Sequence, residues 1–79
     1  MTKAQFVNMV ADILDMSDDT LKGSEELSML DGWDSLARLS FIAAVDKHLG
    51  TVVSTSDISS CITVDDLAAL VQDRLGNNG

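Results

Sequence analysis

The stretch "DSLARLSFIAAVDKHLG", Asp34 to Gly50, decides the fold of this 79-residue chain. Asp and Ser favour the N-terminus of a helix, Gly favours its C-terminus, and apolar residues recur between them at helical spacing. We therefore predict a helix that begins at Asp34 or Ser35 and ends at about Leu49. We expect its buried stripe to contain Leu39, Ile42, Val45 and Leu49, widened by Phe41 and Ala44.

A second helix is predicted at the N-terminal end of the chain, from Thr2 to about Met16. Thr2 and Gln5 have the spacing of a capping box, in which each side chain bonds the other residue's backbone amide. The pattern is lost at Ser17, where short polar side chains compete with helical hydrogen bonds. The expected buried residues of this helix are Phe6, Val10, Ile13 and Leu14.

The last helix has the clearest start signals in the chain. Thr63 is the predicted N-cap, Asp66 lies at the third helical position, and Ile62 is expected to pack on Leu67 across the cap. The segment "TVVSTSD", residues 51–57, is predicted to be a loop that leads into a short helical turn over Ile58 to Cys61. The predicted buried face of the last helix contains Leu67, Leu70, Val71 and Leu75.

These elements predict an all-α fold, a small antiparallel four-helix bundle with three longer helices and one short third helix. Residues 17–33 form a long acidic connection before the central helix, and loops of this length usually pack down or have a function. Its apolar residues, expected to anchor it, are Leu21, Leu27, Met29 and Leu30. We expect one domain over residues 1–76 and a disordered tail over 77–79.

The formal net charge of −8 argues against binding to nucleic acid or to an anionic membrane, because both need Lys and Arg. No apolar run is long enough to span a bilayer, and acids appear too early for a secretory signal. We therefore expect a cytoplasmic monomer. His48 and Cys61 are the only soft metal ligands in the chain, so no zinc site is predicted and no disulfide can form within it. Neither residue has the neighbours that a catalytic role would need.

Ser35 lies where the central helix is predicted to begin, and two interpretations fit it. Free backbone amides and the helix dipole stabilise an anion at such a position, so a phosphate ester on Ser35 would be favoured there. Equally, Ser35 or Asp34 can be an ordinary N-cap. Leu36 is expected to be exposed beside it, available to a partner surface.

The whole pattern resembles the carrier protein superfamily of acyl and peptidyl carrier proteins. The resemblance rests on the small acidic helical chain, the long first loop, "GWDSL" at the central helix and "TVDDL" at the last one. It implies that Ser35 receives 4'-phosphopantetheine from coenzyme A, that Asp34 assists the metal and the transferase during transfer, and that the protein itself catalyses nothing. The arm would hold acyl or aminoacyl groups as thioesters and present them to successive enzymes at high local concentration.

The resemblance also implies partners and a recognition surface. The partners would be a phosphopantetheinyl transferase and acyl- or aminoacyl-activating ligases, acyltransferases or synthases. The charge pattern departs from the fatty-acid type, because the central helix is nearly neutral while the acids gather before it. We therefore expect a freestanding carrier of a specialised pathway, such as polyketide, nonribosomal peptide or related acyl transfer. The implied recognition surface contains Leu36, Leu39, Ile42, Ala43 and Ile58.

Two alternatives lack a prosthetic group. One is an acidic helical module that binds a basic protein partner. The other is a weak calcium site, in which Asp15, Ser17, Asp19 and Glu26 take the first, third, fifth and twelfth positions of an EF-hand loop. Thr20 stands where that loop needs glycine, which disfavours calcium.

Overall fold

The computed structural model describes residues 1–17 and 20–76, and it confirms the predicted all-α fold. Two single-turn 3-10 helices accompany the four α-helices. The predicted tail at 77–79 lies outside the described residues, as does Asp19 of the calcium interpretation. None of the helices among the described residues has the length and apolar character needed to cross a membrane. The elements are α1 (Lys3–Ile13), η1 (Leu27–Met29), α2 (Ser35–Leu49), α3 (Thr55–Ser59), α4 (Val64–Leu70) and η2 (Gln72–Arg74).

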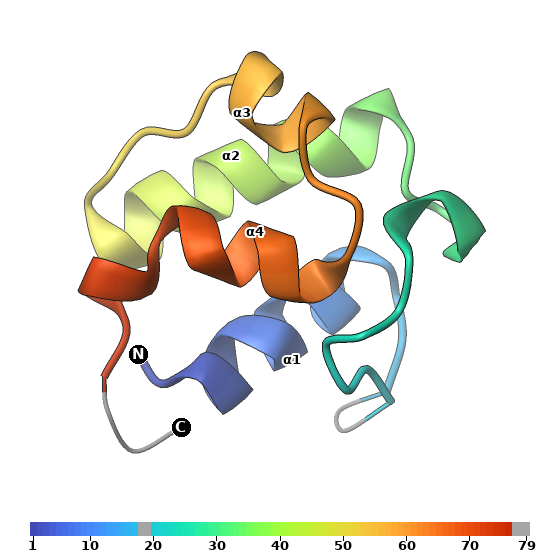
Figure 1. Cartoon of the computed structure of the whole chain (residues 1–79), viewed down its shortest axis with the longest axis horizontal. Helices are drawn as coiled ribbons and strands as arrows, with labels where there is room; N and C mark the ends of the chain where they lie inside the picture. Colours follow the sequence, from blue (N-terminus) through green and yellow to red (C-terminus); the bar gives the residue numbers. More distant parts are fainter. Residues whose placement is uncertain (18–19, 77–79) are drawn as a thin grey trace.

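Helix α1 packs against both α2 and α4 and runs in the opposite direction to them (Figure 1). The two ends of the described chain meet, since Thr2 and Gly76 form a parallel bridge and the Gly76 amide donates to the Met1 carbonyl at 2.7 Å. The start of α2 lies at the opposite end of the bundle in the same view. The long loop before α2 therefore reaches the end of the bundle opposite the bridge between Thr2 and Gly76.

The predicted capping boxes of α1 and α4 are confirmed. Thr2 accepts from the Gln5 amide at 3.2 Å while Gln5 accepts from the Thr2 amide at 2.9 Å. Thr63 and Asp66 make the same reciprocal pair at 3.2 and 3.1 Å. Both boxes depend only on residues three positions apart, which is why the sequence alone revealed them.

The short third helix begins earlier than predicted, which corrects the assignment of Ile58 to Cys61. It covers Thr55–Ser59, and Ser54 caps it by accepting from the Asp57 amide at 3.1 Å. Asp57 in turn accepts from the Ser54 amide at 3.1 Å, so the cap is a third capping box. The sequence signal was present in "STSD", with Asp in the place usually held by Glu or Gln.

The buried face of α2 also differs from the predicted stripe. Ala37, Phe41 and Val45 are buried at four-residue spacing, whereas Leu39 is 58% exposed. Ile42, Ala44 and Leu49 lie at the border and are half-buried against the core. The error arose because α2 is apolar on two sides, and periodicity alone cannot say which side faces the other helices.

An aromatic row links α1, α2 and Trp33, which lies in the loop two residues before α2. The rings of Phe6 and Phe41 meet edge to face, with centroids 5.8 Å apart, and Trp33 approaches Phe41 in the same manner at 6.1 Å. Phe6 and Phe41 are fully buried. Trp33 is half-buried and packs against the core. This contact holds the chain immediately before Asp34 against the bundle.

The buried face of α4 differs in part from the predicted one. Leu67 and Val71 are buried as predicted, while Leu70 and Leu75 are only half-buried. Ile62, predicted to cover Leu67 across the cap, is instead 66% exposed. Two further residues on this face, Val64 and Ala68, complete its buried set.

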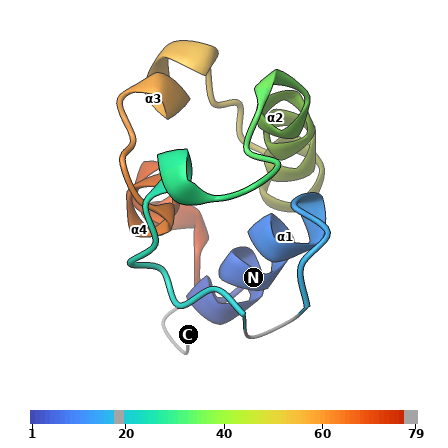
Figure 2. The same ribbon diagram turned by 90° about the vertical axis from the view of Figure 1, so that its right-hand side faces the viewer.

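The long first loop is held against the start of α4, and it crosses the face of the bundle shown in Figure 2. Glu26 and Thr63 form an antiparallel bridge: the Leu27 amide donates to the Ile62 carbonyl at 2.8 Å, and the Val64 amide donates to the Glu25 carbonyl at 3.2 Å. Leu21 and Leu27 are buried as predicted, whereas Met29, also predicted to anchor the loop, is largely exposed. Leu30, the remaining predicted anchor, is half-buried against the core, so backbone pairing and apolar packing together fix this loop.

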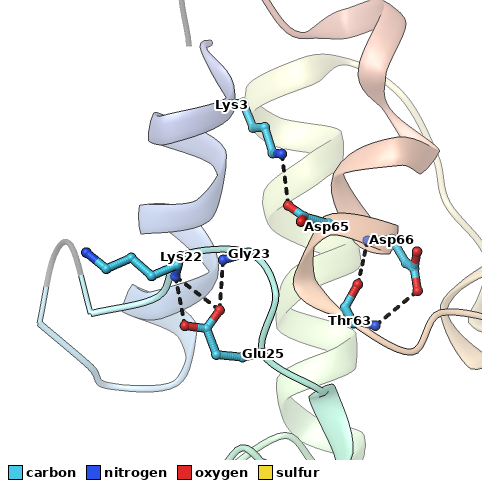
Figure 3. A network of polar contacts seen from close by, with 7 residues as sticks. All are labelled: Lys3, Lys22, Gly23, Glu25, Thr63, Asp65 and Asp66. Atoms are coloured by element: carbon cyan, nitrogen blue, oxygen red, sulfur yellow. Dashed lines mark hydrogen bonds and ion pairs between the residues drawn. The ribbon is translucent and has the colours of Figure 1, made fainter.

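Gly23 allows the closest approach between this loop and α4. Its φ of +116° lies in a region that favours glycine, and the Asp65 amide donates to its carbonyl at 2.8 Å. A Cβ atom at this position would overlap the Asp65 carboxylate, whose Oδ1 is held by the Lys3 ammonium at 2.9 Å (Figure 3). The loop and both helices α1 and α4 thus meet around one carboxylate.

Glu25 closes the turn at the start of this pairing (Figure 3). Its carboxylate accepts from the Lys22 amide at 2.8 and 3.0 Å and from the Gly23 amide at 2.8 Å. The pKa of Glu25 is lowered chiefly by the hydrogen bond from the Lys22 amide, with a further contribution from the Gly23 amide. The ionised carboxylate is therefore the form that stabilises this turn.

We expect Glu25 to make the stability of the domain depend on pH. A lowered pKa in the folded state means that the stabilisation is present above the unfolded value of about 4.3 and is lost as pH falls through the folded value. Glu25→Gln should reduce the free energy of unfolding at about pH 7 and change it much less at about pH 3. Urea unfolding at both pH values measures this difference.

Glu26→Gln is the matched control, since it removes the same charge from the neighbouring residue, whose side chain makes no capping bond. Removing any acid from a chain of net charge −8 reduces electrostatic repulsion in the folded protein, and the Glu26→Gln variant measures this general effect. Equal pH profiles for the two variants would show that the Glu25 turn does not contribute.

Candidate functional site

Asp34, not Ser35, is the N-cap of α2. Asp34 has extended backbone angles, and its Oδ1 accepts from the Ala37 amide at 2.9 Å. Ser35 is the first helical residue, so its hydroxyl is not needed to begin the helix. The interpretation as an ordinary N-cap therefore applies to Asp34. Ser35 does not cap the helix and is available for another role.

Ser35 is exposed and lies in surroundings that suit an anion. Within the described part of the chain, the amides of Ser35 and Leu36 have no protein acceptor, as expected for the first turn of a helix. The guanidinium of Arg38, one turn later, donates from Nη2 to Ser35 Oγ at 3.3 Å. Open amides, the positive end of the helix dipole and a guanidinium thus gather around one exposed hydroxyl.

The loop before α2 fixes the position of this hydroxyl. The Trp33 amide donates to the Leu30 carbonyl at 3.3 Å, and the Asp34 amide donates to the Gly32 carbonyl at 2.9 Å. Gly32 has a φ of +88°, which allows the chain to turn sharply after η1. With Trp33 packed on Phe41, the start of α2 is held from both sides.

An exposed apolar surface extends from Ser35 along α2. Leu36 is 72% exposed, as predicted, and Leu39 and Ala43 follow at spacings of three and four residues on the same side of the helix. Ile42, assigned to the recognition surface, is half-buried beside it. Ile58, assigned to the same surface, is only 2% exposed and lies in the core, so its side chain does not belong to this exposed apolar surface. Its side chain anchors the short α3 instead.

The comparison with protein families decides the identity of this arrangement. The model of the family described as "phosphopantetheine attachment site" matches residues 4–71, which is most of the chain. The chain belongs to this family. As predicted, it is a member of the carrier superfamily, and the cofactor of such a domain is covalently attached 4'-phosphopantetheine. Searches of curated proteins and of solved structures each found no significant match.

The carrier domain fits the prosthetic group that its family implies. A phosphodiester is an anion on a serine oxygen, and the start of α2 offers an exposed serine, open amides and a guanidinium. This assignment overturns the alternative of an acidic module without a prosthetic group. In the part of the chain that the structure describes, no three His, Cys, Asp or Glu side chains gather as metal ligands.

Cys61 and His48 are not part of this site. Cys61 follows α3 rather than lying in it, is half-buried, and its thiol donates to the Asp57 carbonyl at 3.4 Å. Burial raises the pKa of the Cys61 thiol, and the carboxylates of Asp66 and Asp57 raise it further. The thiol is therefore protonated near neutral pH, which does not suit a nucleophile. His48 is exposed in the last turn of α2.

Sequence reasoning did not assign a role to Arg38. The spacing of three residues between Ser35 and Arg38 places the two side chains on one helix face, so the signal was available once the helix start was known.

Proposed function

We propose that Ser35 is the serine that carries 4'-phosphopantetheine and that the protein is an acyl or aminoacyl carrier without catalytic activity of its own. The observation that carries this proposal is the exposed Ser35 hydroxyl, which Asp34 leaves free by capping α2 itself. The family match supplies the nature of the group. A separate transferase would join Ser35 Oγ to the pantetheine-side phosphorus of coenzyme A while the pyrophosphate P–O bond breaks, releasing adenosine 3',5'-bisphosphate and the hydroxyl proton.

The thiol at the end of the arm would hold the cargo as a thioester. Tethering gives each partner enzyme a substrate at high effective concentration, provided that the arm reaches its active site. The proposed partners are a phosphopantetheinyl transferase and the ligases, acyltransferases or synthases that load and use the cargo. We also propose that the carrier domain covers residues 1–76. It would act as a monomer in the cytoplasm.

We further propose that the pathway is a specialised one, such as polyketide, nonribosomal peptide or related acyl transfer. The exposed apolar side chains that α2 presents from Ser35 onward are Leu36, Leu39 and Ala43, and the charged residues of this helix nearly balance. Partners that dock on this surface would bury apolar area rather than match a row of acids. That differs from the acidic docking helix expected of the fatty-acid type.

Intact mass spectrometry tests the proposal. The chain is incubated with coenzyme A, magnesium and a promiscuous phosphopantetheinyl transferase, together with a known carrier as a positive control. The expected result is one added phosphopantetheine per chain. If the control is modified and this chain is not, the carrier function is refuted.

Asp34 is proposed to have two functions, which different substitutions separate. Asn caps a helix about as well as Asp, so Asp34→Asn should preserve stability while removing the charge that is proposed to assist the metal during transfer. Asp34→Ala should lose about 1 kcal/mol of stability as well. We expect both variants to be modified at least tenfold more slowly than wild type, measured as the initial rate of mass gain. A wild-type rate for Asp34→Asn would restrict Asp34 to capping.

A further inference from the structure

Arg38 is the basic side chain that α2 places beside the proposed attachment oxygen. Its Nη2 atom donates to Ser35 Oγ at 3.3 Å, and its backbone amide donates to the Asp34 carbonyl at 3.0 Å in the first turn of the helix. A guanidinium has five donors in a planar fork, and a single hydrogen bond to a hydroxyl uses one of them. The remaining donors are suited to an oxyanion bonded through that same oxygen.

The acidic sequence before α2 makes such a cation important. The segment from Asp12 to Asp34 contains eight acids and a single basic residue, Lys22. A phosphodiester on Ser35 would therefore place another negative charge next to the Asp34 carboxylate. Open amides at the helix start offset part of this repulsion, and a full positive charge within contact distance offsets more.

Two other basic residues, Lys3 and Lys47, lie elsewhere in the fold. Lys3 pairs with Asp65 between α1 and α4 (Figure 3). Lys47 lies in the last turn of α2, about 18 Å along the helix axis from Ser35 at 1.5 Å per residue. Lys47 therefore shares a helix with Arg38 and carries the same charge, but it cannot reach a group on Ser35.

We propose that Arg38 binds the phosphodiester of the prosthetic arm and holds the base of the arm against the first turn of α2. This inference rests on the proposed attachment at Ser35 and adds a positioning residue to it. In the unmodified protein the guanidinium hydrogen bonds the hydroxyl; after modification it pairs with the non-bridging phosphate oxygens. The base of the arm then leaves the helix in a restricted direction beside Leu36, while its thiol end remains free to move.

The change in Tm between the unmodified and the modified protein, compared among variants, tests this proposal. Wild type, Arg38→Gln, Arg38→Lys and the control Lys47→Gln are each prepared in both forms, with complete modification checked by intact mass. Thermal unfolding gives the shift in Tm caused by modification in each background. We expect this shift to be about 2–4 °C less favourable in Arg38→Gln than in Lys47→Gln at low salt. Arg38→Lys should retain part of it, because the charge remains without the planar fork.

Two further measurements distinguish phosphate binding from a structural role of Arg38. The ³¹P resonance of the modified protein should move in Arg38→Gln and not in Lys47→Gln, since only one of these side chains contacts the diester. The Tm difference should also shrink at about 1 M salt, where the screening length falls to about 3 Å. A loss of stability common to both forms cancels in the comparison, as in a double-mutant cycle.

The outcomes separate this inference from the proposed function. If wild type is modified but Arg38→Gln and Lys47→Gln show the same modification shift and the same ³¹P resonance, the role of Arg38 is refuted and the carrier function stands. If wild type is not modified while the control carrier is, both fail together.

Discussion

Replacing Ser35 with alanine is expected to abolish the gain of phosphopantetheine mass completely while leaving the fold intact. Ser35 is exposed at the first position of α2 and does not cap the helix, because Asp34 accepts the Ala37 amide. Alanine is well tolerated in a helix, so the free energy of unfolding should change by less than about 0.5 kcal/mol. Intact mass spectrometry after incubation with coenzyme A and a promiscuous transferase reports the modification, and circular dichroism reports the fold.

Ser40→Ala provides the matched control for this experiment. Ser40 is another exposed serine on α2, one and a half turns further on, and it lies away from the open amides of the first turn. Its variant should gain the full mass. If Ser35→Ala still gains the mass, another hydroxyl is modified and the assignment of Ser35 is lost. Peptide mapping of the modified wild type then identifies the serine that is used.

Elements that depend on residues close in sequence were predicted correctly. The caps of α1 and α4, the start of α2 and its end at Gly50 all follow from side chains within a few positions of one another. Gly50 adopts the left-handed conformation expected of a residue that ends a helix. Even the start of α3, which was missed, had a local signal at Ser54 and Asp57.

Features that depend on packing between distant segments were not predictable in the same way. The pairing of the first loop with the start of α4, through Glu26 and Thr63, joins residues far apart in the chain and leaves no periodic pattern. Met29 and Leu27 look alike in sequence, yet only Leu27 faces the core. The burial of Ile58 likewise depends on where α3 lies above the bundle, which its own sequence does not specify.

In the candidate site, too, the features that depend on local sequence were predictable and those that depend on side-chain packing were not. The position of Ser35 at the beginning of a helix was predictable from "GWDSL", and its exposure followed from that position. The structure added that Asp34 performs the capping and that Arg38 contacts the hydroxyl, because rotamers decide which of several adjacent polar groups meet. Of the residues assigned to the recognition surface, Leu36 and Leu39 are exposed on α2, whereas Ile58 of α3 is buried; the recognition role itself stays a prediction.

Replacing Phe41 with alanine is expected to cause the largest loss of stability among the substitutions considered. Phe41 is fully buried and contacts the rings of Phe6 and Trp33, so the variant loses burial and leaves a void between α1 and α2. Such truncations cost about 3–5 kcal/mol. Small domains have a total stability of about 5–15 kcal/mol, so this loss is a large fraction of the total. Urea unfolding followed by circular dichroism measures the change.

Leu39→Ala tests the same helix on its other side. Leu39 was predicted to be buried but is 58% exposed, so its truncation should change the free energy of unfolding by less than about 1 kcal/mol. Phe41→Leu keeps part of the packing and gives a measurable intermediate value if Phe41→Ala does not fold. Comparable losses for Leu39→Ala and Phe41→Ala would mean that the face of α2 is assigned wrongly. In that case Leu39 would belong to the core, and the apolar surface beside Ser35 would have to be redrawn, because the same rotation of α2 that buries Leu39 also turns Leu36 and Ala43 away from solvent.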